Sequence, residues 1–255
     1  MVDIHSHILP GWDDGSRNME ESLEMLRIAV EGGTTDIVAT PHANGEFPFQ
    51  PDAINRIFGE LKAAADGMIR LHLGCDFHVH FENVQDALLN PTKYTINHGN
   101  YLMVELPDVM NLQVIREILS RLRDRGTIPI ITHPERNMQL QVKPEELKQW
   151  VMDGCLMQIT GQSLLGRFGN TAQHCCNQLL KEDLVHFVAS DAHDTRDRTP
   201  RLSVAYEAIE SRYGKKRAER LFRLNPAAVV AGQPLFAHER QENGRNTKQW
   251  WAFWK

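Results

Sequence analysis

The chain has few cysteines and no long apolar run, and these two absences narrow its class. Its 255 residues include only four cysteines, too few for a disulfide framework at this length, so a reducing cytoplasm is the expected location. No apolar run reaches the roughly 18 residues that suggest a membrane span. The N-terminus becomes polar within three residues, so we expect neither a transmembrane segment nor a signal peptide.

Clustered positive charge is also missing. The formal net charge is −5, and the 28 lysines and arginines are spread along the chain. A nucleic-acid surface needs clustered Lys and Arg, so this distribution argues against a nucleic-acid partner. Hydrophobic residues make up 42% of the sequence, which is enough for a large buried core, and the length suits one large domain.

Seven short apolar runs alternate with helix-like stretches. The expected strands cover 2–4, 35–40, 68–73, 101–105, 128–131, 156–160 and 185–189. Each is apolar on both faces, as buried parallel strands are. Asn18 with Glu21 predicts a capping box before a helix that ends at Gly32, and Pro51 opens a second helix. Further helices are expected over about 111–125, 144–154, 170–182 and 200–232.

Seven βα units in series predict an α/β fold with a parallel sheet and outer helices. A distorted (β/α)7 barrel is the first choice, because polar clusters follow the strands and barrel active sites lie at the carboxyl ends of strands. An open doubly wound sheet is the alternative, but it would not easily bring the first and seventh strands to one place. The barrel is expected to occupy residues 1–237.

Residues 238–255 are expected to form a separate tail. The part up to residue 249 is polar, and Trp250, Trp251, Phe253 and Trp254 then place four aromatic side chains within six residues. The favoured interpretation is packing against a neighbouring face or a second subunit, so a homo-oligomer is one expectation. Contact with a membrane interface, where Trp is enriched, is the alternative.

Histidines and carboxylates follow the expected strands and indicate a metal centre. Residues two apart in a strand share a face, so His5 and His7 converge on one point, as do Asp191 and His193. Mixed imidazole and carboxylate ligands suit Zn, Mn or Fe, and a set this large predicts two or three divalent ions. The nine candidate ligands are His5, His7, Asp14, His42, Asp76, Glu105, His133, Asp191 and His193.

Other histidines receive a structural interpretation. His78 and His80 form a second H-x-H pair, but they lie just past an expected strand and are interpreted as surface residues or neighbours of the ligands. His186 lies inside an expected strand and is predicted to be a core histidine with its hydrogen bonds satisfied.

Two arginines are expected at the rim of the metal centre. Arg136 comes three residues after His133, and Arg198 comes five after His193. Guanidinium binds phosphate oxygens bidentately, whereas lysine offers a point charge, so the pair predicts a phosphoester substrate. In the alternative interpretation, Arg136 is a salt-bridge partner of a carboxylate and Arg198 lies on a solvated face, where Arg196 is its rival.

The cysteines do not support a cysteine phosphatase, which needs an arginine six positions after its nucleophile. The residues six positions after Cys75, Cys155, Cys175 and Cys176 are Phe81, Gly161, Lys181 and Glu182. Because none of them is arginine, a cysteinyl-phosphate route is disfavoured and metal-activated water is the expected nucleophile.

These motifs resemble the PHP (polymerase and histidinol phosphatase) superfamily, and within it the bacterial CpsB/CapC-type tyrosine-protein phosphatases. The matching strings are DIHSHILPGWDDG, TPH, HPER, QITGQSLLGRFG and SDAH with an R-x-P segment, in this order over about residues 1–235. The resemblance implies a distorted (β/α)7 barrel with a trinuclear centre, with Mn as the first expectation and Fe or Zn as alternatives. It also implies a cytoplasmic enzyme that dephosphorylates a membrane-associated tyrosine autokinase controlling capsule or exopolysaccharide synthesis.

Carried over residue by residue, the resemblance implies three metal positions. The first would be held by His5, His7 and Asp191, and the third by Asp14, His42 and His193. The second would be held by Glu105 and His133, with Asp76 as a bridge to the first. Arg136 and Arg198 match the phosphate-binding arginines. Asp13 is the alternative to Asp14, and Asp76 replaces the family's usual glutamate, so its carboxylate reaches one methylene less.

The resulting hypothesis is a metal-dependent phosphotyrosine-protein phosphatase, a phosphoric monoester hydrolase in which hydroxide attacks phosphorus in line. Arg136 and Arg198 would hold the non-bridging oxygens, and His42 or a metal-bound water would protonate the leaving phenolate. The alternative within enzymes is a small-molecule phosphatase of the same superfamily, acting on histidinol phosphate or on a sugar or nucleotide phosphate. The alternative outside enzymes is a scaffolding module with a vestigial centre.

Overall fold

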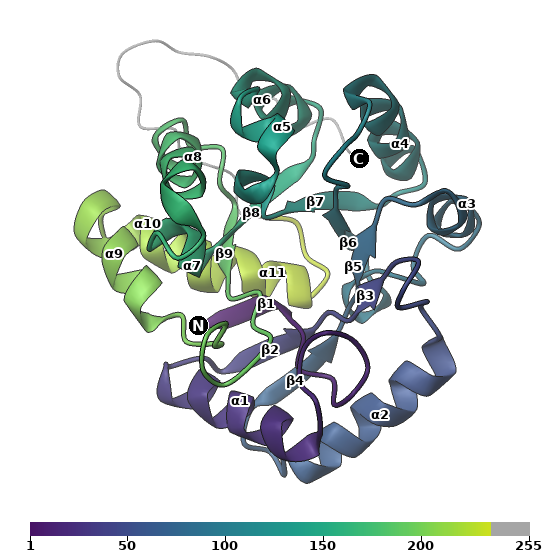
Figure 1. Cartoon of the computed structure of the whole chain (residues 1–255), viewed down its shortest axis with the longest axis vertical. Coiled ribbons are helices and arrows are strands. Elements are labelled where there is room, and N and C mark those ends of the chain that lie inside the picture. Colours follow the sequence, from purple (N-terminus) through teal and green to yellow (C-terminus); the bar gives the residue numbers. More distant parts are fainter. Residues whose placement is uncertain (236–255) are drawn as a thin grey trace.

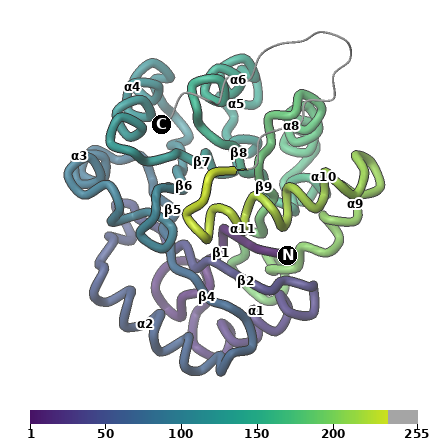
Figure 2. The backbone as a smooth tube through the Cα atoms, turned by 180° about the vertical axis from the view of Figure 1, so that it is seen from behind, coloured from purple at the N-terminus to yellow at the C-terminus, as the bar shows by residue number. Residues whose placement is uncertain are grey.

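The structure is a computed structural model that describes residues 1–235 (Figures 1 and 2). All seven expected strands form: β1 (Val2–Ser6), β2 (Asp36–Ala39), β4 (Arg70–Leu73), β6 (Tyr101–Glu105), β7 (Ile128–Thr132), β8 (Leu156–Thr160) and β9 (Phe187–Ala189). Two further strands lie outside the prediction, β3 (His42–Ala43) and β5 (Asp76–His78). They resume β2 and β4 after interruptions at Thr40-Pro41 and Gly74-Cys75.

The strands fall into two sheets in which every pairing is parallel. One sheet has the order β1-β2-β4, and the other has the order β3-β5-β6-β7-β8-β9. A parallel bridge joins Ser6 to Ala192, and the backbone N–H of His7 donates to the carbonyl of Ala192 at 2.8 Å. The α/β class is therefore confirmed, and the first and seventh expected strands lie together, as an active site built from both requires.

Helices cover the outer faces of both sheets (Figure 1). The expected ones are α1 (Met19–Glu31), α2 (Pro51–Ala64), α4 (Leu112–Asp124), α6 (Pro144–Met152) and α8 (Gly169–Lys181), with α9 (Ser203–Tyr213), α10 (Lys215–Glu219) and α11 (Asn225–Val230) in the region 200–232. Three short helices lie outside the prediction: α3 (Phe81–Leu89), α5 (Met138–Gln141) and α7 (Gly161–Leu164). Tight turns form η1 (Ile96–His98) and η2 (Pro134–Arg136), and a π-helical stretch forms η3 (Arg220–Leu224).

The predicted capping box at α1 forms only in part. The side chain of Asn18 accepts a hydrogen bond from the Glu21 N–H at 3.0 Å, as an N-cap should. The carboxylate of Glu21 does not return to Asn18. It accepts hydrogen bonds from the backbone N–H and the guanidinium of Arg17 instead, and the guanidinium adds an ion pair that the Asn18 N–H could not supply.

Side chains from strands of both sheets share one inner apolar cluster. Alternate residues of a strand face opposite sides, so Tyr101 and Met103 of β6 point inward. They join Val38 of β2, Ile130 of β7 and Phe187 of β9, all fully or almost fully buried. This apolar cluster lies beneath the strand ends, and the polar residues of the candidate site lie directly above it. We call the cluster the floor of the site.

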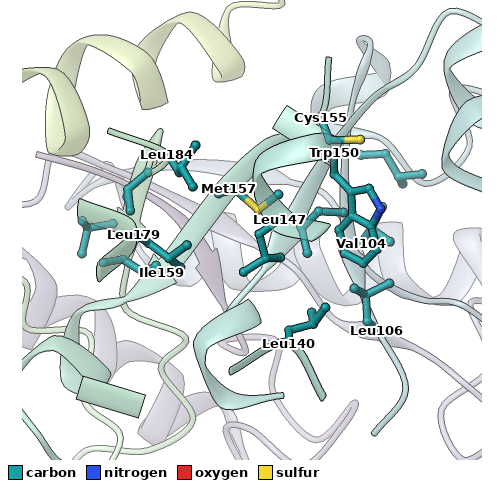
Figure 3. Packing of buried hydrophobic residues seen from close by; sticks show 14 of the residues in the cluster. Val104, Leu106, Leu140, Leu147, Trp150, Cys155, Met157, Ile159, Leu179 and Leu184 are labelled. Carbon is teal, nitrogen blue, oxygen red and sulfur yellow. The ribbon is translucent and has the colours of Figure 1, made fainter. Parts of the chain in front are cut away.

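The outer faces of the strands pack against the helices. Figure 3 shows Leu147 and Trp150 of α6 against the β8 region, where Met157 and Ile159 point outward. All four side chains are buried. Removing a buried tryptophan typically costs about 3–5 kcal/mol, so the burial of Trp150 contributes to holding α6 against the sheet.

Two predictions can be assessed beside this fold. His186 is a buried core histidine whose Nδ1 accepts a hydrogen bond from the Met157 N–H at 3.1 Å, as expected. Among residues 1–235, no helix combines the length and the apolar character that a membrane crossing requires. The predicted tail, 238–255, lies outside the described residues, as does the end of the predicted barrel domain at 237.

Candidate metal centre

The nine predicted ligands come together at the carboxyl ends of the strands. His5 lies within β1, His42 begins β3, Asp76 begins β5 and Glu105 ends β6. The other five follow strand ends or lie in the loop before α1: His7, Asp14, His133, Asp191 and His193. Their ligand atoms form four overlapping groups, and within each group all atoms lie within 4.8 Å of one another. The sequence pattern therefore predicted a spatial cluster that the fold assembles.

The spacing of these atoms fits a shared cation better than hydrogen bonds. His42 Nδ1 lies 3.2 Å from Asp76 Oδ2, and His5 Nε2 lies 3.5 Å from Asp191 Oδ1. Ligand atoms about 2.1 Å from one ion lie roughly 3.0–3.4 Å apart, whereas hydrogen bonds are mostly shorter than about 3.2 Å. Both His42 Nδ1 and Asp76 Oδ2 are buried without a hydrogen-bond partner among the described residues. Burying two polar atoms without hydrogen bonds is costly, and a metal ion bound by both atoms would remove that cost.

The four groups divide the ligands in a way that differs in part from the division the resemblance implies. His7, Asp14, His42 and His193 form one group, which contains the expected third set. The remaining groups are His5 with His7 and Asp76, His42 with Asp76 and Glu105, and His5 with His133 and Asp191. His133 was expected beside Glu105, and its Nε2 lies 3.8 Å from Glu105 Oε1. The assignment of side chains to individual ions stays a prediction.

Unusual backbone geometry directs several of these side chains inward. His133 has φ of 31° and Asp191 has φ of 51°, a region that residues other than glycine seldom adopt. Such strain persists where the surrounding structure enforces it, often at functional sites. In the loop before α1, a Cβ at Gly15 would lie 2.1 Å from the carbonyl oxygen of His7, so only glycine allows the loop to close over that histidine.

Asp13, predicted as the alternative ligand to Asp14, and Gln158, which was not predicted, orient the first histidine pair. Asp13 accepts from His7 Nδ1 at 2.8 Å and also from the His42 N–H at 3.0 Å. Gln158 of β8 lies with its Oε1 2.9 Å from His5 Nδ1. Carboxylates and amides in this position fix the ring and turn its other nitrogen toward a metal. Gln158 left a signal in the sequence, because it is the one amide inside an apolar strand.

The position of Asp13 also bears on the choice between two adjacent aspartates. Asp13 is buried behind His7, at hydrogen-bond distance. Asp14 Oδ1 lies 3.4 Å from His42 Nε2 and 3.5 Å from His193 Nε2, and its side chain is half exposed. Asp14 thus faces two imidazoles at ligand spacing, whereas Asp13 holds one imidazole in place.

Protons occupy the centre in the absence of cations. Burial disfavours the charged form of His5, but the carboxylates of Asp76 and Asp191 outweigh it and raise its pKa to about 9. Burial likewise opposes the protonation of His42, yet the nearby carboxylates of Asp14 and Asp76 raise its pKa to about 11. Burial and the negative charge of Asp76 raise the pKa of Glu105 to about 8. Metal binding must therefore displace protons from this centre.

The two predicted arginines meet at one carboxylate oxygen of the centre. Arg198 Nη2 donates to Asp191 Oδ2 at 2.6 Å, and Arg136 Nη1 donates to the same oxygen. Arg136 lies in η2 and Arg198 in the loop after β9, so two separate segments aim guanidinium groups at one point. The rival Arg196 is exposed and binds Asp194 only through its backbone N–H. The structure thus places Arg198, and not Arg196, at the centre.

An aromatic residue outside the prediction lies beside both arginines. The guanidinium carbons of Arg136 and Arg198 are 4.8 and 5.8 Å from the ring centroid of Phe168. These distances lie within the roughly 6 Å range of a cation–π contact. Phe168 lies between α7 and α8, close to Gly166 and Gly169, which both have positive φ. We infer that the ring limits the directions in which the two guanidinium groups can point.

His78 and His80, the second H-x-H pair, belong to none of the four groups of ligand atoms. His80 Nδ1 pairs with Glu82 at 2.5 Å, and its side chain is half exposed. His78 follows Asp76 on β5 but belongs to no candidate group among the described residues. Their interpretation as surface or neighbouring residues agrees with these positions.

Comparison with known proteins places this geometry in a family. A family model described as "Capsular polysaccharide synthesis, CpsB/CapC" matches residues 1–231. The tyrosine-protein phosphatase YwqE of Bacillus subtilis is 34% identical over 245 residues, covering 94% of this chain and 96% of that protein. The tyrosine-protein phosphatase CpsB of Streptococcus agalactiae serotype III is 30% identical over 243 residues, covering 90% and 98%.

Solved structures agree with the sequence comparison. One reported for YwqE of Bacillus subtilis and CpsB of Streptococcus pneumoniae, described as metal-dependent tyrosine phosphatases, superposes with a TM-score of 0.86 at 31% identity. The match covers 96% of this chain and 100% of that one. A lactonase from Listeria monocytogenes, at 14% identity and a TM-score of 0.59, shares the fold alone.

Proposed function

Because the chain belongs to the CpsB/CapC family, we propose that it is a metal-dependent phosphotyrosine-protein phosphatase, a phosphoric monoester hydrolase. The observation that supports this most directly is the convergence of Arg136 and Arg198 on Asp191, inside a cluster of nine metal-type side chains. Cationic groups and metal ligands at one point suit phosphoryl transfer, which depends mainly on positioning and charge stabilisation.

The cofactor we propose is a set of two or three divalent ions, with Mn first and Fe or Zn as alternatives. The ligands would be His5, His7, Asp14, His42, Asp76, Glu105, His133, Asp191 and His193. When bound, such ions supply a water that ionises near neutral pH. Asp13 and Gln158 would keep the first two imidazoles oriented before and after loading.

The protein's own groups would bind and orient the substrate. With a cation held at Asp191, the guanidinium groups of Arg136 and Arg198 would be available to the non-bridging oxygens of a phosphate, and Phe168 would restrict their movement. The two predicted roles of His42, ligand and proton donor, compete. Its Nδ1 faces Asp76 and its Nε2 faces Asp14, so we assign it the ligand role and leave protonation of the phenolate to solvent at the rim.

The framework we propose is a single distorted (β/α)7 barrel. Three features support it: β3 and β5 continue β2 and β4, the Ser6–Ala192 bridge links β1 to the end of β9, and strands of both sheets share the inner cluster. The distortion would lie between β4 and β6, which are not paired among the described strands and have η1 packed against both.

The physiological substrate we propose is a tyrosine-phosphorylated protein, first a membrane-associated tyrosine autokinase that controls capsule or exopolysaccharide synthesis. The support is the family description and the names of the relatives given above. A cytoplasmic location follows from such a substrate. A homo-oligomer is part of this hypothesis only because the aromatic residues of the predicted tail could pack against a second copy of the chain.

A comparison of substrates tests the proposal. Protein loaded with Mn²⁺ is assayed on a phosphotyrosine peptide, histidinol phosphate and p-nitrophenyl phosphate, before and after chelation with EDTA. We expect the peptide to have the highest kcat/KM, and chelation to abolish all activity until Mn²⁺ is restored. Activity that survives complete metal removal would contradict the metal-dependent mechanism, and a preference for histidinol phosphate would replace the proposed substrate class.

A further inference from the structure

Residues of α3, of α4 and of the segments before them line an apolar groove. Figures 1 and 2 show these two helices next to each other, outside the strands that carry Asp76 and Glu105. The volume of the groove is about 480 Å³. Its apolar lining includes Val79, Phe81, Leu88, Met110, Val114 and Ile118. Phe81 is 69% exposed and Val114 is 48% exposed, although both are large apolar residues. An exposed apolar surface of this kind commonly marks a site of interaction.

The inner end of the groove is joined to the metal centre. Val79 comes three residues after Asp76, and its N–H donates to the carbonyl of Glu105 at 3.0 Å. Pro107, also in the lining, comes two residues after Glu105. At about 3.3–3.6 Å per residue, both lie at most about 10 Å along the chain from a candidate ligand. The groove therefore begins within about 10 Å of two residues that carry candidate ligands, which a polypeptide with its phosphotyrosine at the centre could reach.

The length of a substrate decides what can fill the groove. A small phosphate ester held at the centre ends within the first few ångströms of the rim. A polypeptide continues on both sides of its phosphotyrosine, and a residue three positions away is up to about 10 Å along the chain. That reach matches the distance from the centre to the groove. The lining nearest the centre combines apolar Val79, Pro107 and Met110 with the polar His80 and Asn111. The charged Glu117 and Arg121 lie farther along α4.

We propose that this groove binds an apolar side chain of the phosphoprotein, within three residues of the phosphotyrosine. This proposal rests on the proposed function. The metal centre and the arginines recognise the phosphate, which every phosphotyrosine carries. The α3–α4 groove recognises a neighbour, so it distinguishes one phosphotyrosine sequence from another. The groove thus contributes to KM for peptides and not to the hydrolysis of small aryl phosphates.

The test uses peptides with phosphotyrosine among alanines and a single leucine at each of the three positions before or after it. For the wild-type protein loaded with Mn²⁺, we expect leucine in at least one position to lower KM about tenfold. Val114→Glu should abolish that preference, while kcat and KM for p-nitrophenyl phosphate stay unchanged. Phe81→Ser, at the other side of the groove, is a second variant that should give the same result if Val114→Glu lowers the yield of folded protein.

Val204→Glu is the matched control, because Val204 is 50% exposed on α9 and does not line the groove. It should retain the leucine preference. The absence of any preference in the wild type, or its persistence in both groove variants, would overturn the proposal. So would a dimer that Val114→Glu dissociates without changing peptide KM, because a second copy would then be the occupant. Failure of the proposed function is distinct, since the wild type would then hydrolyse none of the phosphotyrosine peptides, wherever the leucine stands.

Discussion

The two ends of the inner strand surface differ sharply in chemistry. Below the strand ends, inward-facing residues such as Met103, Ile130 and Phe187 form an apolar floor. Two residues further along the same faces come Glu105 after Met103 and Thr132 after Ile130, next to the metal centre. In the floor, apolar side chains pack against one another. At the rim, buried polar atoms have no hydrogen-bond partner among the described residues, and some residues have positive φ. One strand thus supports stability at one end and chemistry at the other, and substitutions should separate the two.

The largest expected effect on the rim comes from Arg136→Ala. Loss of a guanidinium that stabilises the transferring phosphoryl group should lower kcat by about 10³-fold, while metal content by elemental analysis stays unchanged. Arg196→Ala is the control, because Arg196 is exposed and makes no contact with the centre among the described residues. If both variants retain full turnover, the phosphate role of Arg136 is wrong.

On the floor, the corresponding substitution is Phe187→Ala. Phe187 is fully buried in the inner cluster, so its loss should reduce the free energy of unfolding by about 3–5 kcal/mol. Activity per folded, metal-loaded molecule should stay within about twofold of the wild type. Urea unfolding and an assay below the transition measure both quantities. A loss of turnover without a loss of stability would mean that floor and rim are not separable.

A smaller effect is expected for Phe168→Leu, which removes the ring beside both arginines but keeps an apolar side chain. Because a cation–π contact contributes about 0.5–2 kcal/mol, kcat/KM should fall roughly tenfold with metal content unchanged. Phe168→Tyr should restore most of the activity, since it restores the aromatic face. Equal activity of the leucine and wild-type proteins would show that the ring does not position the arginines.

The smallest effect concerns protons. The pKa values of His5 and His42 are raised to about 9 and about 11, so both rings are protonated at pH 7 in the metal-free protein. Metal binding requires their deprotonation, so the apparent affinity should rise as pH increases from 6 toward 9, with net release of protons. Calorimetry in two buffers of different ionisation enthalpy measures that release. A pH-independent affinity for Mn²⁺ would contradict this description of the centre.

The sequence alone predicted the strands and the candidate ligands at their ends better than it predicted the short strands, the Phe168 ring and the groove around them. All seven main strands and the clustering of nine polar residues could be predicted, because each ligand follows a short apolar run and parallel strands gather their ends at one edge. The two-residue β3 and the short β5 could not, since their pairing depends on the register of neighbours. Phe168 lies in the matching string QITGQSLLGRFG but was assigned no role, because its contact with the two arginines depends on packing between distant segments. The α3–α4 groove was missed because it has no local signature and also arises from such packing.

The proposed phosphatase mechanism requires cations in the cluster at the strand ends. Anomalous X-ray diffraction from crystals of the protein loaded with Mn²⁺ tests this directly. We predict two or three peaks about 3.5–4 Å apart, each bound by side chains from His5, His7, Asp14, His42, Asp76, Glu105, His133, Asp191 and His193. Anomalous peaks elsewhere in the molecule, with the nine side chains still paired only with one another, would contradict the metal-centre assignment and the mechanism built on it.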